Sequence, residues 1–134
     1  IHIRSIIMRV EHQNGRVYIV NWMYRKVPST ILLREETMRF EKINKRKLTD
    51  EELNNLRKMI KDVMQTVCIL KVLNEENNAA VIAEGVAEQS IVDTFNKNKG
   101  RKVSLLKALK QIFNTPVDRL TFWESYFRMR NGSY

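Results

Sequence analysis

The segment 93–102 holds the residues whose types and order come closest to a binding site. It reads Asp-Thr-Phe-Asn-Lys-Asn-Lys-Gly-Arg-Lys. Its glycine lets the backbone turn tightly into a helix, and the free N–H groups of that helix start, with Arg101 and Lys102 beside them, attract an anion. Phe95 offers an aromatic face on which a base can stack, and Asn96 can read a base edge or a ribose hydroxyl. The pattern predicts a site for a phosphorylated, nucleotide-like ligand.

A plainer interpretation of the same segment stays open. In it, the stretch is a loop in which Phe95 fills a gap in the core and Asp93 caps the helix. Basic side chains in a first helical turn oppose the helix dipole, at a cost of about a few tenths of a kcal/mol. A bound anion would offset that cost, which favours the binding interpretation for Arg101 and Lys102.

Positive charge is concentrated at the C-terminal end of the chain. The 134 residues carry a formal net charge of +9, and residues 96–134 account for +7 of it, with nine basic and two acidic side chains. Such crowding indicates an anionic partner, which is a nucleic acid, a phosphorylated small molecule or an acidic protein face. A solvated, solubilising surface is the alternative. The nine basic residues are Lys97, Lys99, Arg101, Lys102, Lys107, Lys110, Arg119, Arg128 and Arg130.

Four of these residues are predicted to share a groove. Lys107 and Lys110 lie three apart, away from the apolar stripe of their helix. If the last two helices pair antiparallel, Arg101, Lys107, Lys110 and Arg128 line one basic surface between them. Arg128 also stands near a helix C-terminus, where a cation interacts favourably with the helix dipole without any ligand.

Residues for enzyme chemistry are scarce. The chain has two histidines and one cysteine, with no metal-ligand spacing and no glycine-rich phosphate loop. We therefore predict no catalysis, no cofactor and no metal. Cys68 stands alone in an apolar run, which predicts no disulfide and a reducing, cytoplasmic location. No apolar stretch approaches the roughly twenty residues of a membrane-spanning helix, so no membrane partner is expected.

The first half of the chain is predicted to be mostly sheet. Residues 3–11 and 16–26 are rich in β-prone side chains and flank Asn14-Gly15, which favours a hairpin with a type I′ turn. The second of these strands is apolar on both faces, so a helix or another subunit must cover each face, and we expect a homo-oligomer. Residues 30–33 and 37–43 read as strand.

The remaining elements alternate between helix and strand. Thr49 and Glu52 form a capping box before a helix over about 50–65, and apolar runs at 67–73 and 79–86 form a second hairpin. Helices follow Gly100 and Thr115. The fold class is therefore α+β, with an antiparallel sheet of four or five strands, one packed helix and a C-terminal helical hairpin. We expect a single domain over 1–134, divided into a sheet part (1–89) and a basic helical hairpin (90–134).

The last fifty residues resemble a group of small phage and prophage proteins. The shared pattern is a strand ending in small residues, then Asp-x-Phe, Gly-Arg-Lys and a helix rich in Ala and Leu. This group includes the phage Thoeris anti-defence proteins, which are oligomeric sponges that sequester cyclic ADP-ribose-type signals without cleaving them. The resemblance implies ligand roles for Phe95, Asn96, Arg101 and Lys102. The residues that carry it are Gly85, Val86, Ala87, Asp93, Phe95, Asn96, Gly100 to Lys110, Arg119, Trp123 and Tyr126; where such proteins often carry Cys and Pro before the Asp, this chain has Gln89, Ser90 and Ile91.

Three functions follow as hypotheses. The first is a non-catalytic phage counter-defence protein that sequesters a phosphorylated nucleotide-type immune signal. The second is a small basic phage regulator that binds the backbone phosphates of a nucleic acid through the C-terminal helices. The third is an inhibitor that docks on a host defence protein through the basic face.

Overall fold

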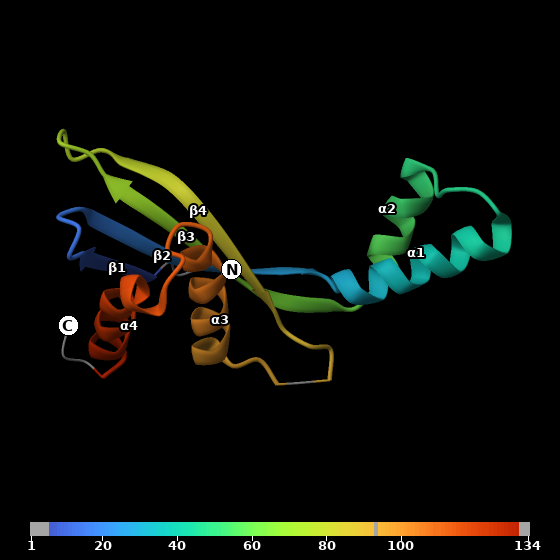
Figure 1. The fold of residues 1–134 in the computed structure, drawn as a ribbon. Coiled ribbons are helices and arrows are strands. Elements are labelled where there is room, and N and C mark those ends of the chain that lie inside the picture. The colour runs from blue at the N-terminus through green and yellow to red at the C-terminus, as the bar shows by residue number, and fades with distance from the viewer. Residues whose placement is uncertain (1–5, 93, 132–134) are drawn as a thin grey trace.

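The computed structural model describes residues 6–92 and 94–131. Four antiparallel strands form one sheet in the order β1-β2-β3-β4, and four helices accompany it (Figure 1). The predicted α+β class, the antiparallel sheet and the C-terminal helix pair are confirmed. The elements are β1 (Ile6–Glu11), β2 (Val17–Pro28), α1 (Thr30–Asn44), α2 (Asp50–Met59), β3 (Asp62–Leu73), β4 (Ala79–Glu88), α3 (Lys97–Lys110) and α4 (Pro116–Arg130).

Both hairpins close with the same kind of turn. In the first, the N–H groups of His12 and Gly15 bond to the carbonyls of Arg16 and His12, and Gly15 has a φ of +85°. Asn14 does not take a positive φ, so the predicted type I′ turn is wrong, and the loop is a type I turn followed by a left-handed residue. In the second hairpin Asn77, with a φ of 62°, takes that left-handed place. An asparagine tolerates this conformation better than most residues.

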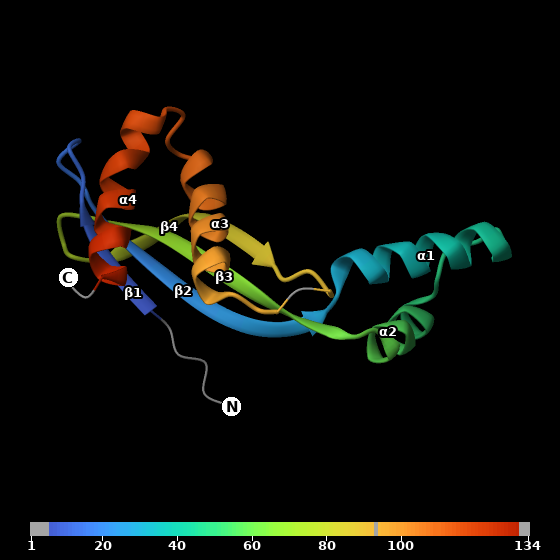
Figure 2. The same ribbon diagram turned by 90° about the horizontal axis from the view of Figure 1, so that it is seen from below.

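The two C-terminal helices cover one face of the sheet. Helix α3 packs on β3 and β4, and α4 packs on β1 (Figures 1 and 2). The two helices run in opposite directions across the strands (Figure 2). The core between these layers includes fully buried Trp22, Leu70, Leu105, Phe122 and Met8. We call the sheet with α3 and α4 the body.

Helix α3 approaches the sheet unusually closely at two glycines. A Cβ placed on Gly85 of β4 would lie 2.0 Å from the carbonyl oxygen of Ser104 in α3. A Cβ on Gly100 would lie 2.4 Å from Thr66 Oγ1 of β3. The absence of side chains at these positions lets the helix backbone rest directly on β3 and β4. Gly85 thus belongs to the packed strand β4.

Helix α4 buries one side against the sheet. Its buried residues are Phe122, Ser125 and Tyr126, while Val117 and Leu120 are exposed. The helix is fixed at its start by Thr115, whose hydroxyl accepts the N–H of Asp118, as the sequence predicts. His12 fixes the rotation of α4 about its axis. Its Nε2–H donates to the Asp118 carbonyl at 2.7 Å, and its Nδ1 accepts the N–H of Asn14. These contacts turn Phe122 inward beside the His12 ring.

Residues 30–44 form a helix, so the strands expected over 30–33 and 37–43 are wrong. Ser29 caps α1 by accepting the N–H of Leu32, and Glu36 pairs with Arg39 one turn later at 3.3 Å. The alternation of apolar and charged residues over 37–43 resembles a strand, but Leu, Glu, Arg, Met and Lys are strong helix formers. The helix ends where Lys45 takes a left-handed conformation, with a φ of 53°.

Helices α1 and α2, with the residues that join them, form an extension that we call the arm (residues 29–61). The predicted capping box is present, with Thr49 and Glu52 bonding reciprocally at the start of α2. The helix does not pack on the sheet, however, because the arm projects beyond the far ends of β2 and β3 (Figures 1 and 2). No side chain of α1 or α2 is buried.

The sheet face opposite α3 and α4 has no helix against it in Figure 1. On it, Ile7 and Met23 are exposed, while Ile19 and Asn21 are half-buried. The prediction that a helix or a subunit covers both faces of β2 thus holds within the chain for one face only. Within residues 6–92 and 94–131, no helix has the length and apolar character needed to cross a membrane.

Candidate functional site

A cavity lies where the start of α3 meets the end of β4. Its volume is about 420 Å³, within the range typical of small-ligand sites. β3 contributes Thr66, and β4 contributes Ala87 and Glu88. The segment that follows β4 contributes Gln89, Ser90, Thr94, Phe95 and Asn96. One face of α3 closes the cavity with Lys99, Gly100, Val103 and Lys107.

Asn96 defines the edge of the cavity by starting α3. Its Oδ1 accepts the N–H of Lys99 at 3.0 Å, and its carbonyl accepts the N–H of Gly100 at 3.0 Å. The helix therefore begins at Lys97, and Gly100 lies inside its first turn; the expectation that Gly100 precedes the helix is wrong. Asparagine at the N-cap is a strong local signal that outweighs the glycine. Asp93, the alternative cap, lies outside the described residues.

Thr66 gives the cavity a buried polar group without a partner. Its side chain is fully buried, and among the described residues no hydrogen bond reaches its Oγ1. A buried hydroxyl left unpaired costs about 1–3 kcal/mol. The neighbouring residue Gly100 offers the hydroxyl no partner, because it has no side chain and presents only its Cα there. A ligand or a water molecule in the cavity would relieve the cost.

Two ammonium groups and one carboxylate line the cavity. Lys107 Nζ donates to the carbonyl of Val86 at 2.9 Å, which holds its charge at the edge of β4. Within the described part of the chain, no hydrogen bond or ion pair fixes Lys99 Nζ, which is exposed. Glu88 is already engaged, because its Oε2 accepts both the N–H and the hydroxyl of Thr30. Lys99 is thus the lining cation most available to a ligand.

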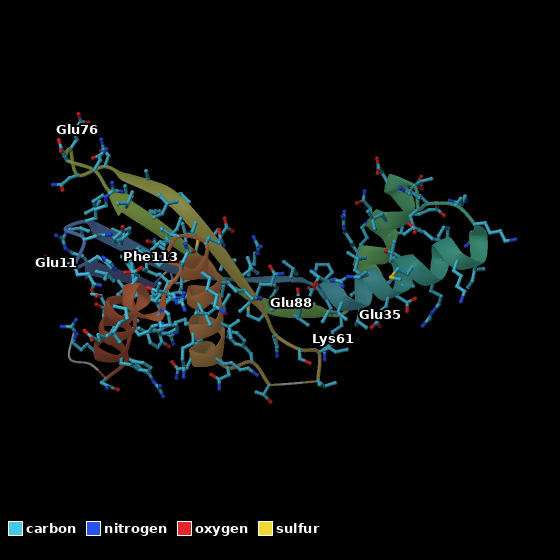
Figure 3. The ribbon with its side chains drawn as sticks, in the orientation of Figure 1. Glu11, Glu35, Lys61, Glu76, Glu88 and Phe113 are labelled. Carbon is cyan, nitrogen blue, oxygen red and sulfur yellow. The ribbon has the colours of Figure 1, made fainter. Side chains whose placement is uncertain are left out.

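The carboxylate of Glu88 connects the cavity to the base of the arm. Its Oε1 accepts from Gln65 Nε2 at 2.9 Å, and Gln65 Oε1 accepts from Arg25 Nε at 2.8 Å. Figure 3 shows Glu88 at the end of β4, where the sheet narrows toward α1. These bonds hold the wall of the cavity in place and occupy the carboxylate. The donors are neutral, so the negative charge of Glu88 stays in the cavity wall, near the two ammonium groups.

Phe95 joins the cavity to the aromatic side chains of the body. Its ring lines the cavity and meets the ring of Tyr24 edge-on, with centroids 5.7 Å apart. Lys97 Nζ stands 5.9 Å from the centroid of the Tyr24 ring. Phe95 is half-buried rather than a core residue, so part of its surface remains available for stacking.

The structure divides the six predicted ligand residues into two groups. Phe95, Asn96 and Lys107 line the cavity, whereas Arg101, Lys102 and Arg128 do not. Arg128 is exposed on α4 and donates to Ser125 Oγ at 3.4 Å. Lys102 is half-buried on α3, with no hydrogen bond or ion pair among the described residues.

Arg101 lies near β2 and α4. Its carbonyl accepts from Trp22 Nε1 at 3.2 Å, and its charge lowers the pKa of Tyr24 and Tyr126, against the larger raising effect of burial. Lys107, in contrast, is held at β4. Arg101 and Lys107 therefore lie on different sides of α3, so the four residues Arg101, Lys107, Lys110 and Arg128 do not form the expected single groove.

The polar lining residues Thr66, Glu88 and Lys99 were not predicted as ligand residues from the sequence. Lys99 belongs to the predicted segment. Val103 and Lys107 follow it by four and eight residues, a spacing that places the three side chains on one face of a helix. Thr66 and Glu88 carry no comparable signal, because only strand pairing brings β3 and β4 under α3.

Other reactive groups are remote from the cavity or buried. Burial raises the pKa of the Cys68 thiol to about 12, which disfavours its thiolate. No cluster of three or more His, Cys, Asp or Glu side chains suited to a metal ion occurs within residues 6–92 and 94–131.

Comparison with known proteins gives no relative, as no protein-family model, curated protein or solved structure matches the chain.

Proposed function

We propose that the protein binds a phosphorylated, nucleotide-like molecule in the α3 cavity and holds it without chemical change. The observation that carries the proposal is the composition of the cavity, in which Phe95, Asn96, Lys99 and Lys107 meet around a volume of about 420 Å³. An aromatic ring suits a base, an amide suits a ribose or base edge, and two ammonium groups suit phosphate. The unpaired hydroxyl of Thr66 supplies a further group for a ligand to satisfy.

The electrostatics of α3 support an anionic ligand. The helix carries six basic residues and no acidic one, and its first turn has no acid to compensate the helix dipole. The positive end of that dipole stands at Asn96, on the rim of the cavity. A phosphate there gains from the dipole and from Lys99 together.

The biological role follows from the resemblance of the last fifty residues to phage anti-defence proteins. On that basis the ligand is an immune signal of the cyclic ADP-ribose type, and the protein acts in the cytoplasm of a host cell by lowering the free concentration of the signal. Tight binding without turnover is sufficient for such a role.

Calorimetric titration with cyclic ADP-ribose tests the proposal through two matched lysines. Lys99→Gln removes a cation from the cavity, and Lys110→Gln removes an exposed cation from the same helix outside it. We expect Lys99→Gln and Phe95→Ala each to weaken binding by about tenfold or more, and Lys110→Gln to leave it within about twofold. No saturable binding, or equal losses for the two lysine variants, would refute the cavity as the site.

A nucleic acid is the second candidate, because the basic residues of α3 continue beyond the cavity to Lys110. The dependence of the binding affinity on salt concentration distinguishes the two functions. Binding of a polymer weakens steeply with salt as counterions are released, and every exposed lysine contributes a similar share. Titration of a 20-base single-stranded DNA at several salt concentrations would show that steep slope, with Lys99→Gln and Lys110→Gln equally weakened.

A further inference from the structure

The arm carries apolar surface that no described part of the chain covers. Neither of its helices has a buried residue, and the exposed fractions of Met59, Ile43 and Met38 are 83%, 70% and 62%. Helices of 10 to 15 residues are marginal alone in water and draw most of their stability from packing. The arm therefore lacks the packing partner that α3 and α4 find on the sheet.

The apolar surface includes a groove between α1 and α2. Its volume is about 410 Å³, and its apolar lining consists of Phe40 and Ile43 from α1, Leu48 before α2, and Leu56 and Met59 from α2. Leu48 lies beside the first turn of α2 and Met59 ends the helix, so the groove follows the length of α2. A helix laid along this groove would cover it from end to end.

The charges along α2 indicate which helix fits. The first turn carries Asp50, Glu51 and Glu52, and the last turn carries Arg57 and Lys58. Glu52 is held by Arg46, with distances of 2.8 and 3.0 Å, and by the capping box. Asp50, Glu51 and Lys58 are exposed and have no ion-pair partner among the described residues. If the α2 of a second copy ran antiparallel to this one, the basic end of each helix would lie beside the acidic end of the other.

We propose that the arm is a homodimer contact, in which the α2 helices of two copies pack antiparallel about a two-fold axis. An antiparallel pair is self-complementary, as a two-fold interface requires, because each copy offers both charge signs at opposite ends of one helix. Met59 of each copy then lies over the Leu48 end of the other copy's groove. Methionine, flexible and polarisable, fills such a groove well. This contact uses the arm rather than the sheet face of β2.

Reversing the charges at either end of α2 tests the antiparallel arrangement, with dimerisation measured by sedimentation equilibrium. The Asp50→Lys/Glu51→Lys variant makes both ends of α2 basic, and the Arg57→Glu/Lys58→Glu variant makes both ends acidic. Each variant alone should dimerise at least about tenfold more weakly than the wild type, since like charges now face each other. An equimolar mixture should regain the wild-type affinity within about threefold, because opposite charges meet again.

Glu75→Lys/Glu76→Lys is the matched control, since it makes the same change of charge in the β3–β4 turn, far from the arm (Figure 3). It should leave the dimer unchanged. A wild-type protein that stays monomeric at about 100 μM, a dimer that either α2 variant leaves intact, or a mixture that fails to associate would each overturn the proposal.

A disulfide gives a second measurement that depends on geometry rather than charge. Asn55 is exposed and lies near the middle of α2, so the two-fold axis brings its two copies close together. Asn55→Cys should form a covalent dimer under mild oxidation, whereas Asn78→Cys in the β3–β4 turn should not. The native Cys68 is buried and does not compete. Equal cross-linking of the two variants would overturn the antiparallel arrangement.

Discussion

The body and the arm use helices of similar length in opposite ways. α4 and α1 each have 15 residues, and each carries several large apolar side chains. α4 buries Phe122 and Tyr126 against the sheet, while α1 buries nothing. The difference arises from attachment: α3 and α4 follow the sheet and fold back over it, whereas α1 and α2 extend from the distal ends of β2 and β3 (Figure 2).

The comparison shows that an apolar helix face does not by itself indicate where a helix packs. The close approach of α3 depends on two residues of the sequence that lack side chains, Gly85 and Gly100. The arm meets no such surface. At its tip Arg46 binds Glu52 and lies 5.0 Å from the centroid of the Phe40 ring. We therefore expect the body to determine the stability of the chain and the arm to contribute to its association.

The largest expected effect is the loss of a central core side chain. Trp22→Ala removes a fully buried ring that packs against Tyr126 and donates to the Arg101 carbonyl. The free energy of unfolding should fall by about 3–5 kcal/mol, against a change within about 0.5 kcal/mol for Ile31→Ala in the arm. Urea denaturation followed by circular dichroism measures both, and similar losses would contradict the division between body and arm.

A smaller but still large effect is expected where α3 touches β4. Gly85→Ala places a methyl group within 2.0 Å of the Ser104 carbonyl and 2.7 Å of the Ala108 nitrogen, both backbone atoms. The helix must move, so the free energy of unfolding should fall by about 2–3 kcal/mol. Glu84→Ala, at the exposed neighbouring position, is the control and should change stability by less than about 0.5 kcal/mol. An unchanged stability of Gly85→Ala would refute the close packing.

Removal of the arm should change stability little. Pro28 and Asp62 are paired across β2 and β3, so a short glycine-containing turn can replace residues 29–61. We expect a midpoint of thermal unfolding within about 5 °C of the wild type, because no side chain of either arm helix is buried. Differential scanning calorimetry on dilute protein measures it, and a body that no longer folds would show that the arm is part of the core.

The smallest effect concerns the pH dependence of the arm. The Arg46 guanidinium and the capping bond from Thr49 lower the pKa of Glu52 from 4.5 to about 2. The stability that this pair gives is therefore complete above pH 4.5 and is lost as the pH falls through about 2. NMR titration of the Glu52 carboxyl should show that midpoint, and Arg46→Gln should move it back toward 4.5. A wild-type midpoint near 4.5 would show that the pair does not persist in solution.

Local signals in the sequence predicted several elements of both the body and the arm. The capping box at Thr49, the Thr115-Pro116 start of α4 and the two hairpins are each specified within a few residues. Residues 30–44 failed as a prediction, because a strand-like alternation and good helix formers coincide there and the Ser29 cap decides between them. The turn at Asn14-Gly15 shows the same limit, since two turn types accept the same pair of residues.

The candidate site was predictable only where it is local. Phe95, Asn96 and Lys107 follow from one stretch of chain, while Thr66 and Glu88 enter through strand pairing between β3 and β4. Arg101 illustrates the opposite error. Its charge and place in the sequence favour a ligand role, but its position on the helix places its charge near Tyr24 and Tyr126.

Recovery of a bound molecule tests the proposed function most directly. The protein would be saturated with cyclic ADP-ribose, separated from free ligand, and denatured by heat, and the released molecule would be identified by mass spectrometry. We predict one intact cyclic ADP-ribose per chain, and much less from Lys99→Gln than from Lys110→Gln. Absence of retained ligand, or release of a cleaved product, would contradict a site that holds its ligand unchanged.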